Sequence, residues 1–295
     1  MFSSSTWLHL RFPFSYFLLP VFLFAVSISP NLNGSRLLWV FVILHFMVYP
    51  ASNGYNSYFD KDKKSIGGLK NPPVVNRGLY LMALFLDFVA ILLGFFKIGL
   101  LFSIMILIYG MASKAYSHPS IRLKKYPITG WVIAGLFQGF FTFLICYIGL
   151  NDFSFEVTLR APIILPAVLC TLILWANYPM TQIYQHEEDA ERGDNTLSLQ
   201  LGIKKTFLFS MAFFGVATVG FIIYFILYQH QRFAFSFLIA MTPTILFFLF
   251  WMLRTWNDLT KANYVYTMWL NFISSTSLSA FFIYLFLEVS QIGQL

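Results

Sequence analysis

Residues 207–227 read FLFSMAFFGVATVGFIIYFIL, a stretch of 21 residues without a charged side chain. A helix needs about 20 consecutive apolar residues to cross a bilayer, so the stretch is long enough for one crossing. A transmembrane β-barrel would instead need short alternating strands separated by turns. Because a helix satisfies its own backbone hydrogen bonds in lipid, this uniformly apolar stretch predicts a membrane-spanning helix.

Eight further apolar runs are bounded in the same way by charged residues or by Pro, Gly and Asn. Together with the first they predict nine spans, at residues 12–29, 37–58, 79–96, 99–117, 130–150, 159–183, 205–228, 233–253 and 264–287. Only 11% of the residues are charged, against about 25% in an ordinary soluble domain. We therefore expect an all-α, polytopic membrane protein in which residues 1–295 form a single domain. The first run also has some features of a secretory signal, although it is long for one.

The 19 Lys and Arg residues follow the predicted topology. If the N-terminus is cytoplasmic, fifteen of the 19 lie at the N-terminus or in connections that face the cytoplasm, as the positive-inside rule expects. Topology thus accounts for the net charge of +7, and no basic stretch interleaved with aromatic residues indicates nucleic-acid binding. Eight of the 12 Asp and Glu residues lie on the same side. Because this face concentrates both signs of charge, we expect it to carry the functional site.

A first polar segment follows the second predicted span, from Asn53 to Lys64. Asn56, Asp60 and Lys64 recur at intervals of four residues, so on a continuous helix they share a face with Asn53. Amide and carboxylate oxygens suit Mg²⁺, which is usually held by one or two carboxylates together with substrate phosphates. Taken alone, the segment is also compatible with a solvated helix end and a charged loop.

A second polar segment follows the sixth predicted span, from Tyr184 to Thr196. Gln185 and Asp189 are again four residues apart, and the four carboxylates between positions 187 and 191 repel one another unless cations compensate them. Taken alone, this segment is also compatible with a hydrophilic connector. Both segments end an even-numbered span and lie four spans apart, which predicts two four-helix halves, a ninth helix and a shared site. Opposed carboxylates around a membrane cavity would bind divalent cations and, with them, a diphosphate.

The two segments resemble the aspartate-rich motifs of the UbiA superfamily of membrane prenyltransferases. Residues 56–62, NSYFDKD, resemble the first motif, N-x-x-x-D-x-x-x-D, and residues 185–193 occupy the place of the second, D-x-x-x-D. Residues 193–197, GDNTL, are similar to the stretch that follows the second motif. Residues 116–124 are similar to the Tyr-Ser…Arg-Leu-Lys pattern between spans four and five. Nine helices around a central cavity match the family's architecture, so the resemblance covers nearly the whole chain.

The resemblance implies Mg²⁺-dependent transfer of an isoprenoid chain from a prenyl diphosphate to a lipophilic acceptor, such as an aromatic ring or quinone precursor. It implies that Asn56, Asp60 and Asp189 are catalytic and that these three, with Glu188, hold Mg²⁺. The residues expected to bind substrate are Asn53, Lys64, Lys70, Tyr116, Arg122, Lys124, Gln185 and Arg192. The expected surroundings are membrane lipids, with the N-terminus and the site on the cytoplasmic side.

Two positions depart from the family pattern. Lys64 stands where the last Asp of the first motif is expected, and Gln185 stands where the first Asp of the second is expected. Asp62 and Glu188 are close enough in sequence to replace them, but a continuous helix would turn Asp62 about 200° away from Asp60. Alternatively, Lys64 contacts the diphosphate directly. A terpene cyclase of the UbiA type and a non-catalytic protein that binds isoprenoid or lipid phosphates remain alternatives, whereas acidic clusters at one face argue against a transporter.

Other polar residues lie within the predicted spans. Asp87 falls near the middle of the third span, where an ionisable side chain is costly, and we expect it to serve packing rather than acceptor binding. Residues 135–139, GLFQG, form a small-xxx-small pattern that predicts close helix packing. Asn177, Tyr178 and Gln182 precede the second segment at helical spacing, which is compatible with either packing or a cavity wall.

Overall fold

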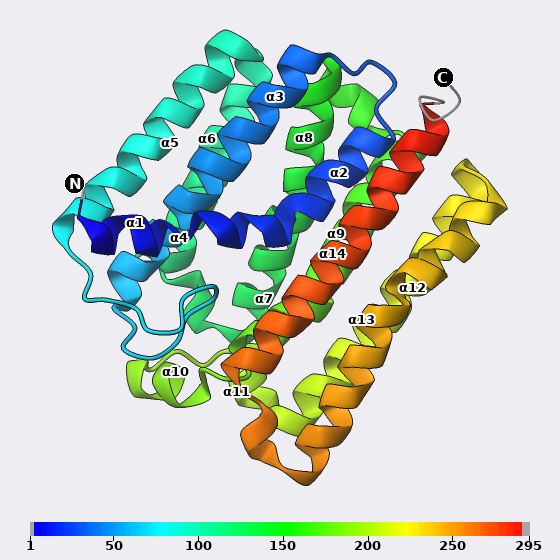
Figure 1. Cartoon of the computed structure of the whole chain (residues 1–295). Coiled ribbons are helices and arrows are strands. Elements are labelled where there is room, and N and C mark those ends of the chain that lie inside the picture. The colour runs from blue at the N-terminus through cyan, green and yellow to red at the C-terminus, as the bar shows by residue number, and fades with distance from the viewer. Residues whose placement is uncertain (1–2, 291–295) are drawn as a thin grey trace.

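The structure, a computed structural model, describes residues 3–290, and the regular secondary structure within that range is helical apart from one isolated β-bridge between Ile66 and Leu69. Nine segments of this range are long and apolar enough to cross a membrane, which confirms the predicted all-α polytopic class. They are Ser4–Ser27, Gly34–Asp60, Arg77–Lys97, Leu100–Ser117, Pro127–Asn151, Ala161–Gln182, Ile203–Tyr228, Gln231–Asn257 and Tyr264–Val289. The bundle that they form is shown in Figure 1.

Six spans are single helices and three are interrupted. The single helices are α5 (Arg77–Lys97), α6 (Leu100–Ser117), α9 (Ala161–Gln182), α12 (Ile203–Tyr228), α13 (Gln231–Asn257) and α14 (Tyr264–Val289). The interrupted spans are α1 (Ser4–Leu10), a 3₁₀ segment (Phe12–Leu18) and α2 (Leu19–Ser27); α3 (Gly34–Ile43), a π-helical turn (Leu44–Val48) and α4 (Tyr49–Asp60); and α7 (Pro127–Gly135), a π-helical turn (Leu136–Phe141) and α8 (Thr142–Asn151). Short helices α10 (His186–Arg192) and α11 (Leu197–Leu201) follow α9, and 3₁₀ turns cover Leu123–Lys125, Phe155–Leu159 and Leu259–Lys261.

The first span begins earlier than the sequence predicts and bends within its length. The predicted start at residue 12 misses α1, in which Ser, Thr and His residues interrupt the apolar run. Arg11 ends α1 in the left-handed conformation (φ 49°), and Pro13 lies at the start of the following 3₁₀ segment. Figure 1 shows the result: α1 runs across the bundle, whereas α2 follows the direction of its neighbours.

Aromatic packing joins the two ends of the chain. The last span, α14, packs against both α2 and α13. The rings of Phe24 and Phe282 stack with their centroids 4.4 Å apart, and Phe221 stacks on Phe237 at 4.7 Å. Such offset ring pairs add to the stabilisation that burial gives. The ninth helix therefore closes the bundle between its first and second halves.

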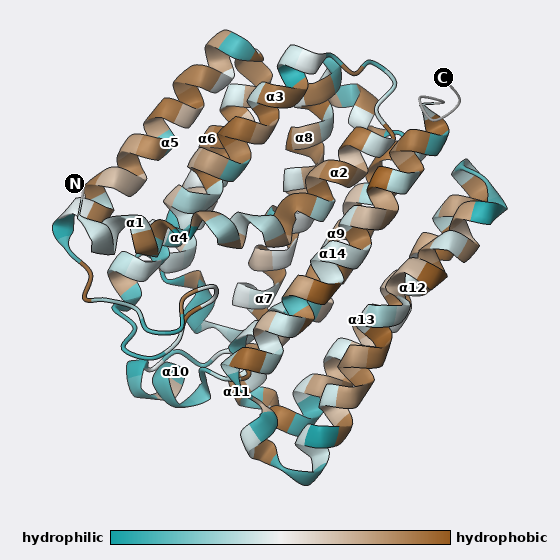
Figure 2. Cartoon of the chain, in the orientation of Figure 1, coloured by the Kyte–Doolittle hydropathy of each residue, from teal (hydrophilic) through white to brown (hydrophobic). Residues whose placement is uncertain are grey.

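The outer faces of the long helices are apolar. Figure 2 shows hydrophobic residues along most of the length of α5, α12 and α13 and hydrophilic residues gathered around α10 and the nearby loops. Ile239 on α13 is 74% exposed and Leu227 on α12 is 66% exposed, as suits side chains that face lipid. Polar residues thus concentrate at one end of the bundle, where α4 ends and α10 lies.

Asp87 has a partner within the helical bundle. Its carboxylate on α5 forms an ion pair with Lys114 on α6, and the Lys114 ammonium also lies 5.0 Å from the centre of the Tyr55 ring. An ionisable group in a span is stabilised by such a partner. The contact links neighbouring helices, in agreement with the predicted packing role.

Two glycines allow the fifth and sixth spans to approach closely, as the small-xxx-small pattern predicts. A Cβ atom placed on Gly139 would lie 2.6 Å from the backbone nitrogen of Thr171 on α9, and one on Gly135 would lie 2.2 Å from the Trp175 ring. Backbone cannot give way as a flexible side chain can. The predicted packing role of these glycines is therefore confirmed.

Replacing Gly139 by Val should destabilise the protein, because the new side chain must push α9 away. Overpacking of a close contact costs about 1–3 kcal/mol, so we expect thermal unfolding in detergent to begin several degrees lower. Gly215→Val is the matched control, since a Cβ at Gly215 on α12 meets no atom within 4 Å. Equal melting temperatures for the two variants would contradict the packing role.

Candidate active site

The first polar segment presents Asn56 and Asp60 from the last two turns of α4. The Asn56 amide oxygen accepts hydrogen bonds from the Ser117 hydroxyl at 2.7 Å and from the Lys124 ammonium at 2.8 Å. The Asp60 carboxylate, only 5% exposed, pairs with Lys124 and lies 3.1 Å from the Arg122 guanidinium. Asn56 and Asp60 therefore share one cation, as their spacing of four residues on a helix allows.

The helix ends at Asp60, and this termination redirects the following residue. Lys61 adopts the left-handed conformation (φ 52°), which L-residues other than Gly rarely adopt, and its amide closes the last turn on Ser57. Asp62 consequently turns inward: its side chain is 4% exposed and forms an ion pair with Arg192. Asp62 can approach the site only if the helix ends before it, and the helix does end at Asp60.

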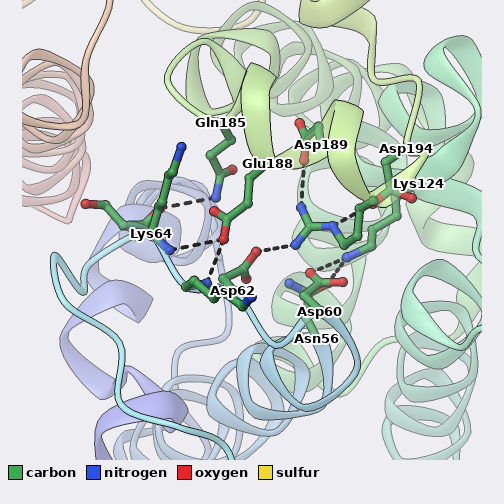
Figure 3. A network of polar contacts seen from close by, with 12 residues as sticks. Asn56, Asp60, Asp62, Lys64, Lys124, Gln185, Glu188, Asp189 and Asp194 are labelled. Atoms are coloured by element: carbon green, nitrogen blue, oxygen red, sulfur yellow. Dashed lines mark hydrogen bonds and ion pairs between the residues drawn. The ribbon is translucent and has the colours of Figure 1, made fainter.

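Glu188 connects the first segment to the second. One of its carboxylate oxygens accepts hydrogen bonds from the backbone amides of Lys63 at 2.6 Å and Lys64 at 3.0 Å. Its other oxygen is buried and has no hydrogen-bond partner among the described residues. Figure 3 shows Glu188 reaching from α10 toward the loop that carries Asp62 and Lys64. The two segments predicted to share a site are therefore in contact.

Two acids of the second segment complete the polar cluster. Asp189 accepts hydrogen bonds from Arg192 at 2.8 Å and from the Thr196 hydroxyl at 3.2 Å. Asp194, 3% exposed, receives two hydrogen bonds from Arg122, at 2.7 and 2.8 Å, and one from Arg192 at 3.1 Å. Paired contacts of this kind are among the stronger hydrogen bonds of proteins.

Arg192 lies at the centre of this cluster. Its three nitrogens contact Asp62, Asp189 and Asp194, so it joins both polar segments. Burial alone would lower the pKa of Arg192, but Asp60 and Asp62 outweigh that effect and raise it above its ordinary value. The guanidinium is thus a permanent cation among buried carboxylates.

The carboxylates outnumber the cations in this cluster. Asp60, Asp62, Asp189 and Asp194 face Arg122, Lys124 and Arg192. Burial raises the pKa of Asp189 to about 6, although Arg192 opposes the shift. Burial and the Asp60 carboxylate also raise the pKa of Asp62. Burial therefore disfavours the charged forms of Asp62 and Asp189, which a further cation would stabilise.

A cavity of about 280 Å³ opens at this cluster and extends between the helices. Asp60, Lys124 and Arg192 line its charged end. Farther along the same cavity lie Phe137 and Leu174, whose side chains are apolar. The cavity can therefore hold a ligand with an anionic head and an apolar chain.

The structure brings most of the predicted site residues to this cavity. Those that line it are Asn53, Asn56, Asp60, Tyr116, Lys124, Gln185, Asp189 and Arg192. Arg122 lies immediately behind, in contact with Asp60. Tyr116 shares a hydrogen bond with Tyr178 across the cavity wall. Asn177, Tyr178 and Gln182, for which the sequence is compatible with either packing or a cavity wall, all line the cavity.

Lys64 and Lys70 lie outside the cavity lining. The Lys64 ammonium pairs with the exposed carboxylate of Glu187, and Lys70 is exposed, with its backbone carbonyl bonded to the Ser65 hydroxyl. Gln185, the other departure from the family pattern, donates to the Ser65 carbonyl at 3.4 Å. The side chains of Lys64 and Lys70 thus do not pair with Asp60, Asp62, Asp189 or Asp194.

Asp194 and Arg11 are cavity residues that the sequence-based assignment did not include. The Arg11 guanidinium donates to the carbonyl oxygens of Gly67 at 3.0 Å and Asn53 at 3.3 Å, and so fastens the loop after α4. Its position before the first span suggested only a topological role. Asp194 carried a signal, because it lies in the GDNTL stretch, but its pairing with Arg122 depends on a contact 72 residues away.

The oxygen ligands in this cluster suit a divalent cation that is held partly by the protein and partly by the substrate. Within residues 3–290 no three His, Cys, Asp or Glu side chains form a ready metal-binding group. Asn56, Asp60 and Asp189, which carry amide or carboxylate oxygens, nevertheless line the same cavity. Mg²⁺ commonly takes only one or two protein carboxylates and completes its shell with phosphate oxygens and water. The residues therefore fit Mg²⁺ in company with a phosphate ligand.

These features define a polytopic membrane protein with a buried, mixed-charge site at the mouth of an amphipathic cavity. A family model described as the UbiA prenyltransferase family matches residues 17–274. The chain therefore belongs to the UbiA prenyltransferase family, as its motifs indicate. No curated protein sequence matches this chain.

Solved structures of similar fold cover almost the whole chain. A UbiA homologue from Archaeoglobus fulgidus bound to GPP and Mg²⁺ gives a TM-score of 0.67 at 15% identity, covering 96% of this chain and 99% of that one. An apo UbiA homologue from Aeropyrum pernix K1 gives 0.70 at 16% identity, covering 93% and 97%. A structure described for digeranylgeranylglyceryl phosphate synthase gives 0.61 at 20% identity, covering 95% and 98%. At these identities the likeness establishes the fold.

Replacing Asp194 by Asn should destabilise the protein strongly, because it leaves the partly buried guanidinium of Arg122 without its main partner. Breaking a buried ion pair costs about 3–5 kcal/mol, which thermal unfolding in detergent would record. Asp152→Asn is the control: Asp152 also pairs with an arginine, Arg36 at 2.7 Å, but its side chain is 75% exposed. A loss of stability as large in the control as in Asp194→Asn would contradict this account of the cluster.

Proposed function

We propose that this protein transfers an isoprenoid chain from a prenyl diphosphate to an aromatic or quinone-precursor acceptor within the membrane, with the help of Mg²⁺. The observation that carries the proposal is the cavity, whose charged end suits a diphosphate and whose apolar walls suit an isoprenoid chain. Membership of a prenyltransferase family supports it. So do the Archaeoglobus fulgidus homologue structures, which were bound to GPP or DMAPP together with Mg²⁺.

Three basic residues are proposed to hold the diphosphate. Lys124 and Arg192 line the charged end of the cavity, and Arg122 stands behind them. When the bond between the allylic carbon and the bridging oxygen breaks, the diphosphate keeps the electron pair and gains negative charge. Fixed cations near these oxygens stabilise that charge more in the transition state than in the bound substrate, and so lower the barrier.

Asn56, Asp60 and Asp189 are proposed to be the catalytic polar residues and, with Glu188, to hold Mg²⁺. The buried free oxygen of Glu188 is a further oxygen donor. Bound Mg²⁺ supplies additional positive charge that stabilises the departing diphosphate. The four side chains keep their oxygens in place beforehand, because Lys124, Arg192 and backbone amides already fix them.

The interior of the cavity is proposed to protect the allylic cation. Its walls include Tyr116, Tyr178 and Phe137, whose ring faces can stabilise positive charge. Apolar walls also exclude water, which would otherwise capture the cation. A carbon of the acceptor then forms the new bond to the allylic carbon, and the acceptor gives a proton to the released diphosphate, which restores its ring.

The charged end of the bundle is proposed to face the cytoplasm, as the distribution of Lys and Arg predicts. Introduced cysteines test this, since the natural Cys146 and Cys170 are both buried. A cysteine at exposed Asn71, in the loop after α4, should resist a membrane-impermeant maleimide in intact cells and react after permeabilisation. One at exposed Gln231, at the opposite end, should react in intact cells. The reverse pattern would contradict the orientation.

A non-catalytic role in binding isoprenoid phosphates is the second candidate. It is favoured by one observation: Arg122, Lys124 and Arg192 already pair with carboxylates, as they would in a site built only to bind. Diphosphate release distinguishes this role from transfer, because a binding protein leaves the prenyl diphosphate intact.

The proposed function is tested by incubating the purified protein with Mg²⁺ and a panel of prenyl diphosphates, with and without candidate acceptors. We expect diphosphate release that requires an acceptor, and at least a hundredfold loss of release in Asp60→Ala and Asp189→Ala because each removes a charged group that the transition state needs. Glu187→Ala is the control, since that carboxylate lies on α10 but is 75% exposed.

The other outcomes separate the alternatives. Release without acceptor, together with a cyclic product, would indicate a terpene cyclase. No release from any donor, with the wild type and Asp60→Ala indistinguishable, would overturn both enzymatic roles and leave the binding role.

A further inference from the structure

The position of Arg192 within the acidic cluster suggests more than diphosphate binding. Its guanidinium contacts Asp62 from the first polar segment and Asp189 and Asp194 from the second, at 2.8 Å for Asp189 and 3.1 Å for Asp194. The carboxylates of Asp62 and Asp194 are at most 4% exposed. Arg192 thus supplies positive charge among buried carboxylates of both segments.

The remaining acids do not offer a second set of free ligands. One oxygen of Glu188 is bonded to the backbone amides of Lys63 and Lys64, and its other oxygen, which has no partner among the described residues, is the one proposed above for Mg²⁺. Lys64 and Gln185, which stand where carboxylates are expected, contact Glu187 and the Ser65 carbonyl instead. A second divalent cation would therefore have to displace Arg192 from Asp62 and Asp194, the two acids that the first cation does not use. That displacement would separate a partly buried guanidinium from its carboxylates, which is costly.

We propose that Arg192 takes the place of a second divalent cation, so that this site binds one divalent cation for each prenyl diphosphate. The inference rests on the proposed function, because it assumes that a diphosphate occupies the charged end of the cavity. Arg192 has five N–H donors, of which three point to carboxylates. The two that remain are available to phosphate oxygens, so the residue can hold the acids together and contact the diphosphate at once.

The single divalent cation then has one place to bind. Asn56, Asp60, Asp189 and the free oxygen of Glu188 supply its protein oxygens. The charge of the ion-pair cluster supports this count. Four carboxylates face three basic residues, so one negative charge remains before a cation and the diphosphate enter. Removing Arg192 would leave Asp62 without its ion pair and would free an oxygen of Asp194 from one contact, which would open the second place.

The test counts bound Mn²⁺ by the loss of the free-ion electron paramagnetic resonance signal, with saturating geranyl S-thiolodiphosphate, which ionises very slowly. We expect one Mn²⁺ per chain in the wild type and two in Arg192→Gln. Arg192→Lys, which keeps a cation, should bind one. Arg254→Gln is the control, because Arg254 lies exposed near the end of α13 and its guanidinium lies over the Phe250 ring.

The possible results test the role of Arg192 separately from the proposed function. Two Mn²⁺ in the wild type, or one in a folded Arg192→Gln, would overturn the role of Arg192. If Arg192→Gln does not fold, the wild-type count still decides, since two Mn²⁺ would contradict the proposal. Binding of the thiolodiphosphate with no Mn²⁺ would also overturn it. Failure of the wild type to bind the thiolodiphosphate at all would instead count against the proposed function.

Discussion

Burial of four carboxylates at one end of an apolar bundle is the constraint on which the site depends. Asp60, Asp62, Asp189 and Asp194 are each at most 7% exposed at the side chain, and an uncompensated buried charge is very costly. Arg122, Lys124 and Arg192 compensate them, and each makes contact with a segment distant in sequence. The ion pairs therefore do two things together: they hold the loop after α4 against α10, and they fix the oxygens that would face a ligand.

This constraint explains why the site and the bundle cannot be separated. The loop residues 61–76 have little regular structure, so their position depends on Glu188, Arg192 and Arg11, which bind their backbone or side chains. Close contacts at Gly135, which lines the cavity, and at Gly139 hold the fifth span against α9. A ligand that enters meets charges placed in advance, and such preorganisation is the main electrostatic source of catalysis in many enzymes.

The spans could be predicted from the sequence because bilayer thickness imposes a minimum length on every apolar run. The meeting of the two polar segments could also be predicted, because both end an even-numbered span. The left-handed turn at Lys61 could not, since it depends on contacts with a distant segment that redirect Asp62. Nor could the central place of Arg192 among acids of both segments, or the hydrogen bonds of Arg11 to the loop. From the sequence alone, an arginine that only follows the positive-inside rule cannot be distinguished from an arginine that belongs to a functional site.

The central claim is that the diphosphate lies among the charged residues while the isoprenoid chain extends into the cavity. Photolabelling with a prenyl diphosphate that carries a diazirine at the far end of its chain tests this most directly. The account predicts labelling of α9 or α14 near Leu174 or Ser275, which line the cavity, and its loss when unlabelled prenyl diphosphate competes. Labelling confined to the lipid-facing surfaces of α12 and α13, unaffected by competition, would contradict it.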